Sequence, residues 1–526
     1  MQGRKDIQPK MMYQVSLEEL VSADNFYRQL DKAIDLRFLY KATAAHYGSE
    51  GQESIDPVVF FKICLIGYLN NINSDRKLIA YCANCLDTRL YLKYDIDEPL
   101  PWHSTISRTR SLYGEEVFIE LFKKVLSLCV AKGMVRGKRQ AIDSAFIKAN
   151  ASMDSLVEKE VLEDAEYYAE ELNDNSEYKV SNTRKKLVDR HHTWKEDEYN
   201  GQPGKPNNTG HSNKLDNTDE HGNLIRPKYL SNHTHYSPTD PDARISVKPG
   251  KARQLNYFGQ LAVDDGHHVI TAARADHADK RDSQCLPAIL SQAIYNLKEH
   301  DIIIEQIAAD TAYSSGESLQ FLENKNIDAY IPNFGQYRNH REGFIYNKEQ
   351  DRYECQRGHK AILPFKNTST DSKGYTKKIY RSSETVCKDC PLRSGCCGKS
   401  TKYKKLDDSI YKPLYDKMHE KLHRNMAYTK RIGRMRSSTV EPVLGTLINF
   451  LNMKRVYTRG IQNANKHVLM SALTYNLKKY IKFVTKKRTV KVQAMNNKAP
   501  NQLKCALHNL ISSILSPYNF TSPLSY

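Results

Sequence analysis

The chain of 526 residues lacks the features that would indicate a membrane protein or a disulfide-bonded secreted protein. Its longest apolar run, Phe60 to Leu69, is interrupted by Lys62 and is far shorter than the roughly 20 residues that cross a bilayer. Its 11 cysteines are an odd number at an ordinary density, so we expect no disulfide framework. The first ten residues are polar, which argues against a secretory signal peptide and predicts a cytoplasmic protein.

Acidic side chains are too few to balance the basic ones. The chain has 79 Lys and Arg against 61 Asp and Glu, a formal net charge of +18. A cytoplasmic chain this basic most often contacts a polyanion, and nucleic acid is the leading candidate. Lysine-rich surfaces also serve solubility, so the charge alone leaves both interpretations open. The length allows about three or four domains.

Helix signals follow one another at the start of the chain. Ser16 with Glu19 predicts a capping box. Asp56 before Pro57 predicts the start of another helix, because the missing N–H of proline costs nothing in a first turn. We therefore expect an all-α, helix-turn-helix-like domain over residues 1–125, whose role is DNA binding or plain helical packing.

Strand patterns begin at Arg139, where RQAIDSAFIKA is rich in alternating apolar residues. Farther on, the turn Asp265-Gly266 lies between two apolar segments and predicts a hairpin. This order of elements predicts an α/β fold with a mixed sheet flanked by helices. The expected elements are a strand from 139, a hairpin over 255–275, a helix at 283–297, a strand ending at Asp310, a helix at 316–324 and a strand at 327–332.

Two polar stretches interrupt this α/β pattern. The first, at about 150–250, is acidic and then rich in Gly, Asn, Pro and His, and the second, at about 333–420, contains cysteines. Both are expected to be insertions. We therefore expect a catalytic domain over 136–485 with two insertions, followed by a basic C-terminal tail at 486–526.

Three acidic residues stand out by position. Asp143 lies in the first strand, Asp310 ends a later strand, and Glu441 is expected at the head of a late helix. Thr439 would cap that helix, which puts Pro442 in its first turn. Three carboxylates brought together repel one another unless cations lie between them, and oxygen ligands suit Mg²⁺. Spacing alone does not single out these three among 61 acidic residues.

The three acids lie in the segments AIDSAFIKANAS, IAADTAYSSGE and RMRSSTVEPVLGTLINFLNMKRVYTRG. Together these segments resemble the catalytic blocks of DDE transposases from bacterial insertion sequences. The helical transposase domain of that family is similar to SLEELVSADNFYRQLDKAIDL, SIDPVVFFKICLIGYLNNINSDRKL and PWHSTISRTR. The segment HVLMSALTYNLKKY is similar to the end of the family's sequences. The resemblance covers most of the chain outside the first insertion and the final forty residues.

This resemblance implies an RNase H-like catalytic domain in which Asp143, Asp310 and Glu441 hold two Mg²⁺ (or Mn²⁺) ions. The implied reaction is two-metal-ion phosphoryl transfer, which cuts DNA at the transposon ends and joins the 3′-hydroxyl to target DNA. The implied partners are transposon-end and target DNA, bound by a homodimer in the bacterial cytoplasm at the nucleoid.

Two departures from the family pattern concern residues around the acids. Ser144 follows the first Asp where many relatives have Gly, and the Tyr, Arg and Lys that accompany the last Glu in some subgroups do not fall at those spacings. We name other basic residues as candidates for DNA binding, with a solvated basic face as the alternative. They are Arg434, Arg436, Lys454 and Arg455.

A group of cysteines lies in the second insertion. Cys387 and Cys390 form one CxxC pair, and Cys355 and Cys396 complete four thiolates that could close a structural Zn²⁺ site. Cys397 and His359 are competing ligands, and reduced cysteines that simply pack are the alternative.

Other functions remain open at this level. The chain could be a catalytically inactive or domesticated DNA-binding protein, or a non-enzymatic zinc-ribbon protein that binds nucleic acid. The presence of all three acids favours an active DDE transposase.

Overall fold

The computed structural model describes nearly three quarters of the chain, in several stretches. These are residues 14–48, 50, 54–158, 231–232, 234–247, 252–334, 337, 339–371, 374–397 and 401–486. Most of the first expected insertion and nearly all of the expected basic tail lie outside the described residues. None of the helices in the described stretches is both long and apolar enough to cross a membrane.

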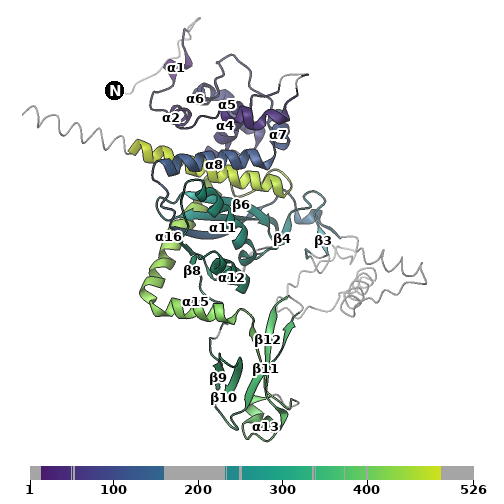
Figure 1. The fold of residues 1–526 in the computed structure, drawn as a ribbon. Coiled ribbons are helices and arrows are strands. Elements are labelled where there is room, and N and C mark those ends of the chain that lie inside the picture. Colours follow the sequence, from purple (N-terminus) through teal and green to yellow (C-terminus); the bar gives the residue numbers. More distant parts are fainter. Residues whose placement is uncertain are drawn as a thin grey trace, which may run out of the picture.

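The N-terminal region is all helical, as expected (Figure 1). Side chains start several of its helices: Ser16 accepts from the amide of Glu19, and Asp56 accepts from the amides that follow Pro57. The ring of Phe61 stacks on Tyr113 in the core of this region. The helices are α1 (Leu17–Leu20), α2 (Phe26–Ala33), α3 (Phe38–Thr43), α4 (Pro57–Leu69), α5 (Asp75–Asn84), α6 (Leu86–Leu92), α7 (His103–Leu112) and α8 (Glu115–Ala131).

A mixed sheet forms the centre of the molecule, as the strand patterns predict. Its central strand β1 (Arg139–Lys148) pairs antiparallel with β5 (Gln254–Asp264) and parallel with β7 (Gln306–Ala308). The strand β8 (Asp328–Tyr330) continues the sheet beyond β7 in parallel. On the other side of β5 lie β6 (Ile270–His277) and the short β4 (Arg244–Ser246).

Helices cover both faces of this sheet. The helix α11 (Asp282–Lys298) packs on β5 and β6, and α16 (Met426–Phe450) packs on β1 and β5. Asp143 contacts a side chain of α16, whereas its neighbour Ser144 contacts α11. Successive side chains of a strand point to opposite faces, so α11 and α16 lie on opposite faces of the sheet. The helix α12 (Gly316–Asn324) has the expected bounds.

The cysteine-containing segment folds into a second sheet that extends away from the central one (Figure 1). All its strand pairs are antiparallel, and Tyr353, Leu363 and Tyr380 form a small core of its own. Its elements are β9 (Phe344–Asn347), β10 (Arg352–Cys355), β11 (Ile362–Thr370), β12 (Thr376–Arg381), α13 (Glu384–Lys388), α14 (Arg393–Cys396) and β13 (Lys405–Ser409). The helix α15 (Lys412–Arg424) leads back to α16, and β2 (Val157–Glu158) pairs with β3 (His235–Tyr236) beside the first insertion.

Two expected strand boundaries are wrong. The second hairpin strand starts at Ile270 rather than at 267, because the amide of Asp264 bonds to the carbonyl of Val269 and closes a wider turn. The apolar segment before Asp310 contributes only the three residues of β7 to the sheet. Asp310 itself caps a short 3₁₀ helix, η3 (Thr311–Tyr313), by accepting from the amide of Ala312.

The expected start of the late helix at Thr439 is also wrong. The helix α16 begins at Met426, where the side chain of Asn425 accepts from the amide of Tyr428. Thr439 is a buried residue inside the helix, and Pro442 also lies inside it, where its missing N–H leaves one helical bond unmade. Thr439 followed by Pro442 imitates the start of a helix, although the helix already begins 13 residues earlier.

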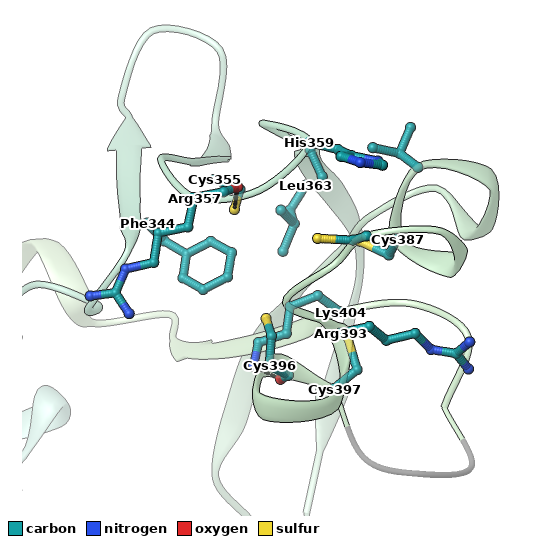
Figure 2. Close-up of a pocket in the computed structure, with 13 residues that line it drawn as sticks. Phe344, Cys355, Arg357, His359, Leu363, Cys387, Arg393, Cys396, Cys397 and Lys404 are labelled. Atoms are coloured by element: carbon teal, nitrogen blue, oxygen red, sulfur yellow. Dashed lines mark hydrogen bonds between the residues drawn. The ribbon is translucent and has the colours of Figure 1, made fainter.

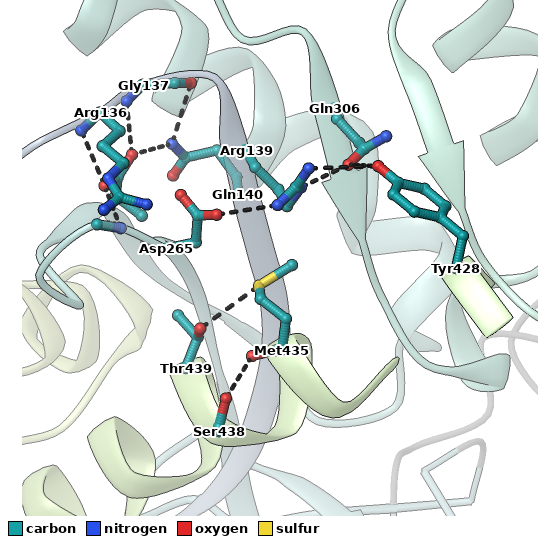
Figure 3. A network of polar contacts seen from close by, with 12 residues as sticks. Arg136, Gly137, Arg139, Gln140, Asp265, Gln306, Tyr428, Met435, Ser438 and Thr439 are labelled. Carbon is teal, nitrogen blue, oxygen red and sulfur yellow. Dashed lines mark hydrogen bonds and ion pairs between the residues drawn. The ribbon is translucent and has the colours of Figure 1, made fainter. Parts of the chain in front are cut away.

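A polar network anchors the start of α16 to the sheet (Figure 3). Arg139, the first residue of β1, donates to Gln306 of β7 and lies 3.1 Å from the carboxylate of Asp265. The hydroxyl of Tyr428 in α16 reaches the same Gln306 at 3.4 Å. These contacts fix the direction in which α16 crosses the sheet.

The helical region and the α/β domain share one core. The helical residues 461–486 run beside α8 (Figure 1). Within this contact the ring of His467 is buried, and its Nδ1 lies 2.7 Å from the hydroxyl of Tyr68 in α4. Burial lowers the pKa of His467 to about 4, and the charge of Arg110 acts in the same direction.

We expect this histidine to make the contact acid-sensitive. The unfolded chain binds the proton near pH 6.5, whereas the folded chain does so only near pH 4, so stability is complete above pH 6.5 and is lost as the pH falls towards 4. A pKa shift of this size lowers the free energy of unfolding by at most about 3 kcal/mol at acidic pH. Thermal unfolding of His467→Gln between pH 7 and 4 should show a smaller acid loss than wild type. The exposed His340→Gln control should keep the full loss, and an equal loss in all three proteins would contradict this prediction.

Candidate active site

One arginine joins two of the three expected acids. Arg436 of α16 donates to Oδ2 of Asp143 at 2.9 Å and to Oε1 of Glu441 at 3.3 Å. The side chains of Arg436 and Asp143 are each 16% exposed, whereas that of Glu441 is 57% exposed. The other oxygen of Asp143 accepts from the amide of Ser144 at 2.8 Å. Asp143 and Glu441, far apart in the sequence, therefore share one cationic neighbour.

Asp310 lies at the end of β7, the parallel neighbour of β1. Burial raises the pKa of the Asp143 carboxyl, and the negative charge of Asp310 raises it further. The amide of Ser144 and the guanidinium of Arg436 oppose this change. Asp143 and Asp310 are thus close enough for their charges to interact.

Glu441 is stabilised differently from the expectation. It is placed well inside α16 rather than in a first turn, so the positive end of the helix dipole does not reach it. Its ion-pair partner is Arg436, five residues earlier on the same helix. A cation therefore replaces the helix terminus that the sequence pattern indicated.

The donor chemistry of the three acids suits a hard divalent cation. Carboxylate oxygens are the preferred ligands of Mg²⁺, and the guanidinium of Arg436 already provides positive charge between Asp143 and Glu441. In the part of the chain that the structure describes, however, no group of three or more His, Cys, Asp or Glu residues is arranged as a metal site.

The four candidate DNA-binding residues differ in exposure. Arg434 and Lys454 are exposed, while Arg455 is half-buried with its guanidinium 5.6 Å from the ring centre of Tyr457. Lys454 and Arg455 belong to the segment after α16 and lie beside the last residue of β1. The amide of Lys148 bonds to the carbonyl of Lys454 at 3.2 Å. Arg436, in contrast, is engaged with carboxylates.

Sequence reasoning missed a fourth acid near this site. Asp282, the first residue of α11, accepts a hydrogen bond from the hydroxyl of Ser144, the residue after Asp143. Burial raises the pKa of the Asp282 carboxyl, and the charge of Asp310 adds to this effect. Its only sequence signal was an acid at the start of a predicted helix, which is common in any protein.

The cysteines of the second sheet line a single cavity of about 30 Å³ (Figure 2). A cavity of this volume is large enough to hold a water molecule. The sulfurs of Cys355, Cys387 and Cys396 point towards this cavity (Figure 2). Burial raises the pKa of the neighbouring Cys397 thiol, and the charges of Cys396 and Cys387 raise it further. The lining includes all six candidate ligands, Cys355, His359, Cys387, Cys390, Cys396 and Cys397.

Two family models match the chain. Residues 15–112 match a transposase domain (DUF772), and residues 354–481 match a transposase DDE domain. No curated protein matches the chain. The second match includes Glu441 and the cysteine cavity, and Asp143 and Asp310 precede it.

The two matches agree with the architecture, since the first falls on the helical region and the second ends on the helix that packs against it. Proteins of this family act on DNA and generally use a divalent metal such as Mg²⁺. The chain belongs to the DDE transposases, with an N-terminal helical transposase domain and an α/β domain of RNase H-like fold.

Proposed function

We propose that this transposase cuts DNA at transposon ends and joins the exposed 3′-hydroxyl to target DNA, with Asp143, Asp310 and Glu441 as its catalytic residues. The observation that carries the proposal is the shared neighbourhood of these acids. Arg436 bridges two of them, and the charge of the third acts on Asp143. Acids that lie close together on separate elements repel one another, and bound cations would remove this repulsion.

In this proposal the three acids hold two Mg²⁺ ions, or Mn²⁺ in their place. When bound, such ions activate the attacking oxygen and neutralise charge on the leaving oxygen of an in-line phosphoryl transfer. The protein contributes position: β1 and α16 hold Asp143 and Glu441, and the turn after β7 holds Asp310. No covalent protein nucleophile is required.

We further propose that DNA runs beside the exposed basic residues around this site. Arg434 on α16 and Lys454 at the end of β1 are exposed and can contact phosphates directly. We call these exposed residues the basic strip, and the half-buried Arg455 lies next to Lys454 in it. Arg436 would contact phosphate only after leaving the two carboxylates.

The proposed domain organisation follows the sequence expectation. A DNA-binding helical domain over 1–125 precedes a catalytic domain over 136–485, and a basic tail over 486–526 follows, in a protein that acts as a homodimer on DNA. The alternatives of an inactive DNA-binding protein and of a non-enzymatic zinc-ribbon protein are not favoured, because both transposase domains match the chain.

The first test replaces each proposed catalytic acid. Asp143→Asn, Asp310→Asn and Glu441→Gln should each reduce cleavage of DNA carrying the flanks of the gene by at least about a thousandfold. DNA binding should persist, because removing an acid reduces repulsion of phosphates. The matched control is Glu323→Gln, an exposed acid on α12 paired with Lys417. Cleavage that survives in any of the three variants would contradict the catalytic assignment.

The second test concerns the basic strip. Arg434→Ala combined with Lys454→Ala should weaken DNA binding and reduce the slope of log affinity against log salt by about two units, one for each lost phosphate contact. Thermal stability should stay the same because both side chains are exposed. A double variant of equal charge, Lys325→Ala with Lys366→Ala, serves as the control. An unchanged salt slope would show that DNA does not contact Arg434 and Lys454.

We also propose that Cys355, Cys387, Cys390 and Cys396 hold one structural Zn²⁺, with Cys397 and His359 as competing ligands. Support comes from the shared cavity and from the soft sulfur donors, which suit zinc. The metal would tie the turn after β10 to α13 and α14 through bonds of about 2.3 Å. It would stabilise the second sheet rather than take part in phosphoryl transfer.

Metal analysis tests this proposal. The purified protein should contain one zinc per chain, and Cys387→Ser should lose it and lower the thermal stability of the second sheet. Cys85→Ser, a half-exposed cysteine of the helical region, is the control and should retain the metal. A wild-type protein without zinc, measured beside a zinc protein that retains its metal, would refute the site.

A further inference from the structure

A buried polar cluster lies on the α11 face of the sheet, opposite the face on which Asp143 meets Arg436. It contains Ser144 of β1 and Gln260 of β5, which are paired in register. The hydroxyl of Ser144 donates to Asp282, and the hydroxyl of Tyr313 donates to Gln260 at 2.9 Å. Gln260 and Tyr313 are fully buried. The proposed reaction assigns no role to this cluster.

Asp282 is the charged member of the cluster. It accepts a hydrogen bond from the hydroxyl of Ser144. Burial raises the pKa of the nearby Tyr313 hydroxyl, and the charge of Asp282 raises it further. Burial raises the pKa of the Asp282 carboxyl, and the negative charge of Asp310 raises it further. A half-buried carboxylate of this kind is costly unless its hydrogen bonds are satisfied, so Ser144 is held in place by it.

The cluster connects the segments that carry two of the proposed catalytic acids. Ser144 directly follows Asp143 in β1, and Tyr313 belongs to the 3₁₀ helix that Asp310 caps. The strand before Asp310 pairs over only three residues, so backbone pairing alone fixes this turn weakly. Tyr313, inserted into the core and bonded to the cluster, supplies the missing anchor.

We infer that Asp282 is a positioning residue of the transposition site: through Ser144 and its register partner Gln260, to which Tyr313 is bonded, it holds Asp310 beside Asp143. Its charge strengthens the binding of a divalent cation by these two acids. This inference rests on the proposed function. A role limited to starting α11 would affect stability and leave cation affinity unchanged, so the two roles can be distinguished.

The test measures Mn²⁺ binding to the full-length protein without DNA, by calorimetry, together with thermal unfolding. Asp282→Asn keeps the size of the side chain and an acceptor for Ser144 but removes the charge, and it should weaken Mn²⁺ binding about tenfold. Cleavage of gene-flanking DNA at saturating Mn²⁺ should also slow, because Asp310 is less well held. The control Glu317→Gln makes the same charge change at an exposed position on α12 and should bind as wild type does.

A second variant covers the case in which Asp282→Asn does not fold. Tyr313→Phe keeps the ring and the charge of Asp282 but removes the hydroxyl, and it should weaken Mn²⁺ binding severalfold. Wild-type affinity and cleavage in either folded variant would overturn the inference. If Asp143→Asn also binds and cleaves as wild type does, the proposed active site itself has failed; if only the Asp143 variant loses both, the site stands and the role of Asp282 is refuted.

Discussion

Repulsion between like charges is the constraint on which the central part of this transposase depends. Asp143, Asp310 and Asp282 interact through their charges, and Glu441 shares Arg436 with Asp143. Buried carboxylates are stable only when hydrogen bonds or cations compensate for lost water. The fold meets this requirement on both faces of β1, with Arg436 on the α16 face and the hydroxyl of Ser144 on the α11 face.

The rest of the architecture keeps this arrangement rigid. Arg139 and Gln306 join β1 to β7 and to the first turn of α16, which sets the path of the helix that carries Arg436 and Glu441. Behind the sheet, the helix over 461–486 packs on both the sheet and the N-terminal helices, and Asn476 bonds to the backbone of Ile270 at 2.9 and 2.8 Å. The helical transposase domain is therefore continuous with the catalytic core rather than loosely tethered to it.

The second sheet is organised by different forces. It has a core of few residues, and its cysteines gather around a cavity beside the turn after β10. So small a core gains much from a cross-link, which is the physical reason for proposing a metal there. The transposase DDE match begins in this sheet, so the matched domain includes its strands β11, β12 and β13.

Local patterns in the sequence were enough to predict the N-terminal helices, the central hairpin, α12 and the mixed α/β fold. These follow from caps such as Asp56 with Pro57 and from apolar periodicity, which depend on neighbouring residues only. Tertiary structure decided the start of α16 and the shortness of β7, because both depend on how these elements meet β1, which the cap signal at Thr439 does not record. It alone paired Arg436 with Asp143 and Ser144 with Asp282, since a side chain's ionic partner depends on which elements meet in space, and no spacing along the chain records that.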